Sequence, residues 1–188
     1  MMIEPKQLIP YRASSDDYGL TESLKARFAR LRTERHPLYL TAEEFQEILH
    51  WKLRGQYGRQ KQRRKANTEH VIRTVTSAAF SVVHPDENYE IELRVGILCC
   101  IRGVGVPVAS AILALVFPEK YAVIDFRGWR QVFGEERTTF SISDYKRYLR
   151  EVKRLAAELE WPVQEVDLAI WAYDRVSGGK SMTNKTAG

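Results

Sequence analysis

The segment Leu98–Arg130 reads LCCIRGVGVPVASAILALVFPEKYAVIDFRGWR and decides the fold of this chain. At its centre a short glycine turn, Gly103-Val104-Gly105, separates two apolar segments. Glycine adopts a positive φ without a steric penalty, and a proline such as Pro107 suits the first turn of a following helix. Ala109 and Ala111 are small enough to let two helices cross closely. The sequence therefore predicts a helical hairpin whose free amides form an anion site.

The hairpin residues also carry a family resemblance. The segment resembles the helix-hairpin-helix of the DNA glycosylase superfamily, which includes endonuclease-III-type, adenine and alkylpurine glycosylases. The residues that match the hairpin pattern are Ile101, Gly103, Val104, Gly105 and Ala109. Asp125 then falls at the position of the catalytic aspartate of that family, and Arg130 matches an arginine that often follows it. The resemblance thus implies a DNA glycosylase with Asp125 as its catalytic residue.

Departures from the family pattern narrow the expected activity. Bifunctional members carry a nucleophilic lysine two residues after the second glycine, where this chain has Pro107, which has no amine. An iron–sulfur cluster would need four clustered cysteines, and this chain has only Cys99 and Cys100. The resemblance therefore implies a monofunctional glycosylase without a cluster. The alternative of a lyase that uses another lysine, such as Lys120 or Lys52, remains open.

Asp125 suits the chemistry of base removal. As an N-glycosidic bond breaks, the sugar becomes oxocarbenium-like, and an ionised carboxylate beside it stabilises the positive charge and orients water. Asp125 precedes a helical pattern, so the helix dipole and free amides would favour its charged form. A purely structural role as an N-cap, contributing about 0.5–2 kcal/mol to the fold, is the alternative, and both roles can hold at once.

Net charge points to a polyanionic partner. Of 29 basic and 24 acidic residues, seven basic ones and no acid lie in residues 52–65, and without those seven the balance is 22 against 24. One local patch therefore accounts for the net charge of +5, although a solvated loop is the simpler interpretation. Arg127 and Arg130 could contact the DNA backbone or pair with acids. The residues expected to contact DNA are Lys52, Arg54, Arg59, Lys61, Arg63, Arg64, Lys65, Arg102, Gly103, Val104, Gly105, Val106, Arg127 and Arg130.

A base pocket and an ion site are further expectations. Aromatic faces stack on bases, although aromatic residues in helices are as often part of the core. The resemblance also implies that carbonyls of the hairpin turn could hold a monovalent or calcium ion, with no cofactor required. The four histidines lack metal-ligand spacing, so no zinc site is predicted. The predicted pocket residues are Trp51, Tyr57, Trp171 and Tyr173, and the predicted ion-binding carbonyls are those of Cys99, Ile101 and Val104.

Apolar residues recur at spacings of three and four, which predicts an all-α fold. We expect one helix-hairpin-helix glycosylase-like domain over residues 1–177, as a compact bundle or two small helical lobes flanking a DNA-binding cleft, and a flexible tail over 178–188. Residues 1–19 read as irregular. Helices are expected over 21–36 with Thr21 as N-cap, 41–53, 68–82, 87–101, 108–117, 126–133, 143–160 and 163–177.

Neither a signal peptide nor a membrane-spanning run is visible, and the adjacent cysteines read as core residues of a reducing compartment. These features predict a cytoplasmic protein, which we expect to be a monomer. The expected activity is hydrolysis of the N-glycosidic bond of a damaged or modified base flipped out of double-stranded DNA, leaving an abasic site. Repair and defence against phage DNA that carries modified bases are equally compatible roles. The alternative is a non-catalytic helix-hairpin-helix module that only binds DNA.

Overall fold

Helices make up the architecture of the computed structural model, which describes residues 3–181, with the side chains of 59–61 and 178–181 outside the description. The expected all-α class is confirmed, since no strand occurs among the described residues. In chain order the elements are α1 (Pro5–Leu8), η1 (Ile9–Tyr11), α2 (Tyr18–Glu34), α3 (Ala42–Leu53), η2 (Arg54–Gln60), α4 (Lys61–Arg64), α5 (Glu69–Ser81), α6 (Glu87–Leu98), α7 (Val106–Val116), α8 (Phe126–Phe133), α9 (Ile142–Leu159) and α10 (Val163–Ser181).

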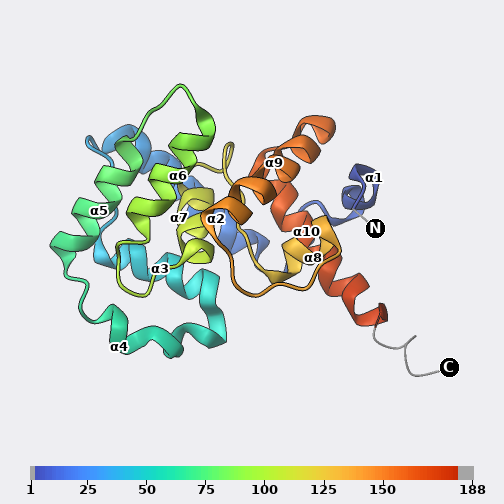
Figure 1. Ribbon diagram of the computed structural model, residues 1–188, viewed down its shortest axis with the longest axis horizontal. Coiled ribbons are helices and arrows are strands. Elements are labelled where there is room, and N and C mark those ends of the chain that lie inside the picture. The colour runs from blue at the N-terminus through green and yellow to red at the C-terminus, as the bar shows by residue number, and fades with distance from the viewer. Residues whose placement is uncertain (1–2, 182–188) are drawn as a thin grey trace.

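Helix α7 is the centre of the molecule. It contacts α2, α3, α6 and α9, and apart from Pro107 all of its residues are buried. Ala109 and Ala111 are fully buried, as the close helix crossing requires. Figure 1 shows α3, α5 and α6 on one side of α7 and α8, α9 and α10 on the other. A helix that is apolar on every face is stable in water only in such a position.

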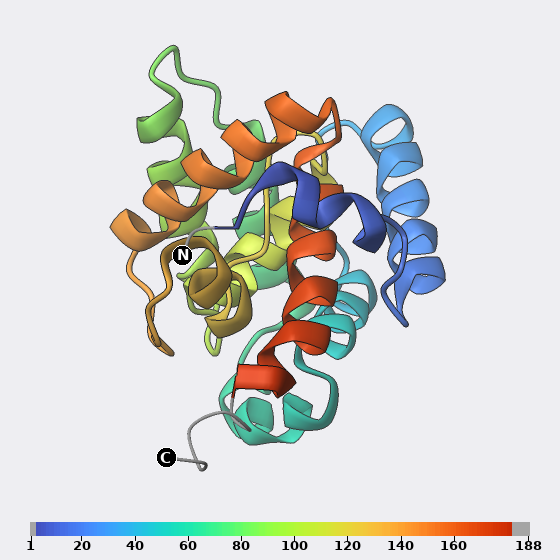
Figure 2. The same ribbon diagram turned by 90° about the vertical axis from the view of Figure 1, so that its right-hand side faces the viewer.

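The second hairpin arm leads into the segment that carries Asp125. After α7, residues 117–120 form a turn and residues 121–125 connect it to α8, which packs on α10 and α9. Helices α1 and η1 cover another part of α10, as the turned view in Figure 2 shows. The turn between α6 and α7, the end of α3 and the start of α8 all lie in the lower half of both views.

Several expected helix starts are confirmed by their capping geometry. Thr41 opens α3 with a capping box, in which its hydroxyl accepts from the Glu44 amide and the Glu44 carboxylate accepts from the Thr41 amide. Thr68 caps α5 through the Val71 amide. These local sequence signals are reliable because the side chain satisfies an amide that has no partner within the helix.

Other boundaries differ from the sequence prediction. Thr21 is not an N-cap, because α2 begins at Tyr18 and the buried Thr21 hydroxyl donates to the Asp17 carbonyl. Ser141, two residues earlier than expected, caps α9. Residues 1–19 are not irregular throughout, since they contain α1 and η1. The basic stretch forms η2 and α4, and α10 runs to Ser181, into the expected tail; residues 182–188 of that tail lie outside the described residues.

No helix within the described residues is both long enough and apolar enough to cross a membrane.

Candidate active site and nucleic-acid interface

The glycine turn adopts the geometry that its sequence predicts. Helix α6 ends at Leu98, three residues earlier than expected, and the chain tightens into a turn in which the Ile101 amide donates to the Leu98 carbonyl. Gly103 has a φ of 82°, in the left-handed region that favours glycine. Gly105 is the N-cap of α7 in extended conformation and offers no side-chain acceptor. Among the described residues, the amides of Gly105 and Val106 have no hydrogen-bond acceptor.

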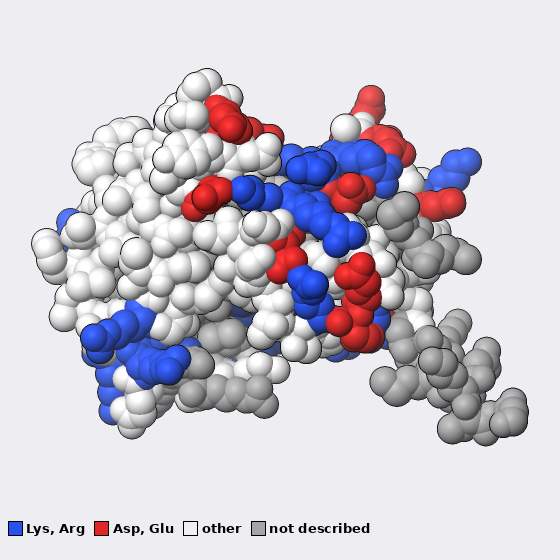
Figure 3. All heavy atoms as spheres, viewed as in Figure 1, with Lys and Arg blue, Asp and Glu red and all other residues white. Residues whose placement is uncertain are grey.

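The end of the basic stretch is tied to this turn. The Asn67 side chain accepts from the Arg102 amide at 3.1 Å and donates to the Arg102 carbonyl at 2.8 Å. Arg63, Lys65 and Arg102 are exposed. In Figure 3, basic side chains gather at the lower left, over the region of α4 and the hairpin turn, without acidic side chains among them. The structure therefore places unpaired backbone amides next to a local positive surface.

The hairpin cysteines are free, and they differ in environment. Cys99 is half-buried, and burial raises the pKa of its thiol, which keeps it protonated and unreactive. Cys100 is exposed, so the expectation that both are core residues is wrong for Cys100. The Ile101 carbonyl already accepts from the Val104 amide. No cluster of metal-ligating side chains occurs in the described part of the chain, and an ion on the carbonyls of Cys99, Ile101 and Val104 stays a prediction.

Asp125 is the N-cap of α8 and one of its oxygens faces a lysine. Its Oδ1 accepts from the amides of Arg127 and Gly128, each at 3.0 Å. Its Oδ2 lies 3.5 Å from Nζ of Lys52, which comes from the last turn of α3. The Asp125 side chain is 24% exposed and that of Lys52 12%. The amides at the start of α8 therefore fix Oδ1 of the carboxylate. The side chain as a whole remains partly accessible to solvent.

Two hydrogen bonds pin the segment before Asp125 to the core. The Ile124 amide donates to the Ser110 hydroxyl of α7 at 3.1 Å. The Val123 amide donates to Oδ2 of Asp167 in α10 at 3.0 Å. Because α7 also begins at the glycine turn, Ser110 couples the position of Asp125 to the hairpin itself. The hydrogen bond between Ile124 and Ser110 therefore fixes where Asp125 lies relative to the glycine turn.

Asp167 is a second carboxyl group close to the first. It is buried, and Oδ1 accepts from the buried Tyr148 hydroxyl at 2.9 Å. Burial, together with the charge of nearby Asp125, raises the pKa of Asp167 to about 7. Asp167 therefore titrates near neutral pH, and its hydrogen bond from the Val123 amide positions the backbone that leads to Asp125.

The raised pKa of Asp167 makes stability depend on pH. The folded state holds this proton up to about pH 7, whereas an unfolded aspartic acid loses it near its ordinary pKa of 3.8. The free energy of unfolding should therefore fall between about pH 4 and pH 7 as far as Asp167 contributes. In the D167N variant, whose amide can still accept from Val123 and donate to Tyr148, this contribution should vanish. Urea denaturation of both proteins at pH 5 and pH 8 checks this, and an equal pH dependence would contradict it.

Arg127 and Arg130 pair with a buried acid. Oδ2 of Asp174 lies 2.9 Å from Nη1 of Arg127, and Oδ1 lies 2.8 Å from Nη2 of Arg130. Gln131 also donates to this carboxylate, whose pKa is lowered by these hydrogen bonds against the opposing effect of burial. Pairing with acids, the alternative to DNA contact, is therefore what both arginines do in the free protein. These ion pairs join α8 to α10.

The other predicted basic residues whose side chains the structure describes separate into three groups. Arg54 forms an ion pair with Asp17. Arg64 is buried, with its guanidinium bonded to the Tyr57 carbonyl and stacked on the Tyr57 ring, so a DNA contact by Arg64 is wrong for this conformation. Arg63 and Lys65 are exposed, as is Arg102 in the turn. The side chains of Arg59 and Lys61 lie outside the described residues.

The predicted pocket aromatics do not form one cluster. Trp171 is half-buried, with the guanidinium of Arg54 at 4.7 Å and that of Arg127 at 5.8 Å from its ring. Tyr57 stacks on His50 at 3.7 Å between ring centroids. Tyr173 packs edge-on against Tyr11 near α1, and its hydroxyl accepts from Gln7. The packing of Tyr173 against the N-terminal helices contradicts a place for it in a pocket with the other three.

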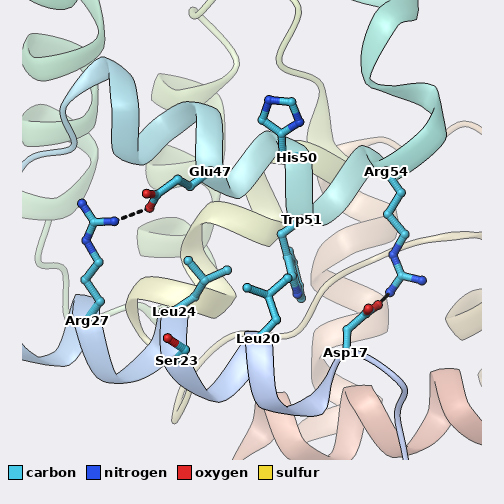
Figure 4. A pocket seen from close by; sticks show the side chains of 9 residues that line it. All are labelled: Asp17, Leu20, Ser23, Leu24, Arg27, Glu47, His50, Trp51 and Arg54. Atoms are coloured by element: carbon cyan, nitrogen blue, oxygen red, sulfur yellow. Dashed lines mark hydrogen bonds and ion pairs between the residues drawn. The ribbon is translucent and has the colours of Figure 1, made fainter.

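Trp51 lines a pocket of about 480 Å³ between α2 and α3. Figure 4 shows its indole beside Leu20 and Leu24, with the ion pairs of Arg27 with Glu47 and of Arg54 with Asp17 at the two ends. The indole N–H donates to Thr21 at 3.0 Å. Asp125 does not line this pocket. The cavity is therefore separate from the carboxylate, although Trp51 directly precedes Lys52.

Sequence reasoning missed the two buried aspartates of α10. Asp167 and Asp174 lie seven residues apart, which places both on the face of α10 that packs on α8 and the segment before it. Two acids at this interval among the apolar residues of α10 are a usable signal, because seven residues are two helical turns. The contact of Lys52 with Asp125, 73 positions apart, has no comparable local signal.

Comparisons of the chain with protein-family models, with curated proteins and with solved structures gave no match.

Proposed function

We propose that this protein is a DNA N-glycosylase of the helix-hairpin-helix type, which hydrolyses the bond between deoxyribose and a damaged or modified base. One observation carries the proposal. Asp125 presents a partly exposed carboxylate whose Oδ1 is fixed by two amides and whose Oδ2 lies 3.5 Å from Nζ of Lys52. A carboxylate held in this way can stabilise an oxocarbenium-like sugar without reorganising during the reaction.

The hairpin supports a role in holding the DNA strand. The free amides of Gly105 and Val106 and the exposed Arg102 would grip a phosphate, since a helix start attracts anions. The target nucleotide would rotate out of the duplex toward Asp125, with the half-buried Trp171, whose ring lies 5.8 Å from the Arg127 guanidinium, as a candidate to stack on it. We propose that the protein acts as a monomer in the cytoplasm and needs no cofactor, with an ion at the hairpin carbonyls as an added contact.

Substitution of Gly105 can test phosphate binding by the hairpin amides without destabilising the fold. Gly105 is exposed and has an ordinary φ of −109°, and a Cβ there would meet only Pro107 Cδ at 3.9 Å. In G105D a carboxylate would cap α7 and hold its stability, changing it by about a few tenths of a kcal/mol. The same charge would occupy the amides and repel phosphate, so the affinity for a DNA duplex should fall by about tenfold.

The matched control for this prediction is G105S, whose hydroxyl caps the helix without a charge. Its DNA affinity should lie between those of the wild type and G105D. Fluorescence anisotropy with a labelled duplex measures binding, and thermal unfolding measures stability. Binding of G105D at the wild-type affinity would show that phosphate does not dock on these amides.

The activity itself is tested by the release of a free base. The substrates are duplexes with alkylated, deaminated or oxidised bases, together with phage DNA that carries modified bases, and the released base is identified by mass spectrometry. Alkali-labile breaks at the same positions should accompany base release. Excision of lesion bases would indicate repair, whereas excision confined to phage bases would indicate defence. Duplex binding without release from any of these substrates would favour the DNA-binding module.

A further inference from the structure

We propose that Lys52 stabilises the departing base as an anion, and that the substrates are therefore bases that are neutral in DNA, such as deaminated pyrimidines, and not cationic alkylated purines. This inference rests on the proposed function, because it names the substrate class and a further catalytic residue of the same site. Nζ of Lys52 lies 3.5 Å from Oδ2 of Asp125, the oxygen that the amides of α8 do not hold. A cation and a carboxylate thus lie side by side, one for each charge that develops as the glycosidic bond breaks.

The ammonium group of Lys52 has hydrogen-bonding capacity to spare. Its side chain is only 12% exposed, and among the described residues its Nζ makes one hydrogen bond, to Asp125, at the long limit of the usual range. Lys25, which is 11% exposed, has two partners instead, Glu22 at 2.5 Å and Gln164 at 3.0 Å. Because an ammonium group has three N–H donors, Lys52 can donate to an oxygen or nitrogen of a base without leaving Asp125.

Guanidinium groups surround Trp171, the candidate to stack on the base. Those of Arg54, Arg175 and Arg127 lie 4.7, 5.1 and 5.8 Å from the centre of the ring. A free aromatic face attracts a cation, which is the contact that would favour a positively charged base. At Trp171 the cations of the protein itself already make this contact, and like charge opposes the entry of a cationic purine. A neutral base meets no such repulsion.

The three arginines around Trp171 are held in place by acids. The ion pairs are Arg54 with Asp17, Arg127 with Asp174 and Arg175 with Asp16. Pairing reduces the field of these arginines at long range. Lys52 differs from them, because the partner of Lys52 is the carboxylate that would face the sugar. It is therefore the cation that acts on the base itself.

The reaction balances with water as its only co-reactant. As the bond between C1′ and the base nitrogen breaks, its electron pair stays on the base, and the sugar becomes an oxocarbenium ion that faces Asp125. Water adds to C1′ and gives a proton to Asp125. The Lys52 ammonium donates a proton to the base anion and recovers one from Asp125, so both residues return to their starting states. A cationic purine departs as a neutral base and gains nothing from this donor.

Base release from duplexes that differ only in the target base tests this inference. The wild type should release uracil and 5-fluorouracil and should leave 7-methylguanine in the duplex. In K52Q the release of uracil, measured in a single turnover, should fall by about 10²–10³-fold. The fall should be smaller for 5-fluorouracil, because fluorine makes the base a better leaving group that needs less stabilisation. A role of Lys52 in folding or in DNA binding alone would lower both rates by the same factor.

Two variants serve as controls. K52R keeps a cation beside Asp125, so it should release uracil faster than K52Q does. K146Q removes a lysine that is also paired with a carboxylate but lies in α9, and it should release uracil at the wild-type rate. Duplex binding and thermal unfolding of each variant show that it is folded.

The outcomes separate this inference from the proposed function. Release of 7-methylguanine in preference to neutral bases would overturn the inference and leave the glycosylase proposal standing. Release of a neutral base by K52Q at the wild-type rate would do the same, as would equal losses of uracil and 5-fluorouracil release. Absence of release from every duplex by the wild type would overturn the glycosylase proposal itself, and this inference with it.

Discussion

Replacement of Asp125 by asparagine is expected to abolish base excision while the fold and DNA binding persist. Asparagine caps helices as well as aspartate does, and its oxygen can accept from the amides of Arg127 and Gly128 as Oδ1 does now. The lost element is the negative charge that would face the sugar. Excision should therefore fall by about 10²–10⁴-fold, the range that positioned acid–base groups contribute.

Asp86 provides the matched control for that substitution. It also caps a helix, α6, and its Oδ1 accepts from the amides of Asn88 and Tyr89. D86N should therefore leave base release unchanged, which separates loss of a charge at any N-cap from loss of the charge at the site. Base release, duplex binding and thermal unfolding should be measured for both variants. Unchanged excision by D125N would leave Asp125 with only its structural role.

The local parts of the site could be predicted from the sequence. Glycine at position 103 is required by a positive φ, and the small residues of α7 are required by its central, buried position. The capping role of Asp125 also follows from the short pattern that begins α8. Each of these features depends on residues within one or two helical turns of each other, and such interactions leave a readable pattern.

The parts that join distant segments could not be predicted. Lys52 reads as one more cation of a basic stretch, and only the packing of α3 beside the start of α8 brings it to Asp125. Arg64 belongs to the same stretch but is buried against Tyr57. The composition of the basic stretch does not distinguish these environments, because a charged side chain is expected to be exposed to solvent. Tertiary packing therefore divides the predicted patch into a lysine beside Asp125, residues in structural contacts and a remaining exposed surface.

Gly128 connects the packing of the core to the candidate site, because it lies against Tyr148 and its amide donates to Asp125. A Cβ at Gly128 would lie 2.3 Å from the Tyr148 hydroxyl oxygen and 3.0 Å from Cζ of the same ring. Tyr148 is fully buried and its hydroxyl is bonded to Asp167, so the ring has little room to move. G128A should lower the free energy of unfolding by about 1–3 kcal/mol through overpacking, although alanine favours helix by about 1 kcal/mol. Excision should fall too, since the Gly128 amide orients Asp125.

Gly96 supplies the control for G128A, because it is also a helical glycine, but a Cβ there would meet only Ile142 Cδ1, at 4.0 Å. G96A should be neutral or raise the free energy of unfolding by about 0.5–1 kcal/mol. In a Y148F background the clashing oxygen is gone, so the cost of G128A should shrink, and urea denaturation of the four proteins measures this coupling. An equal cost in both backgrounds would mean that the start of α8 is not fixed by Tyr148, and that Asp125 owes its orientation to the helix cap alone.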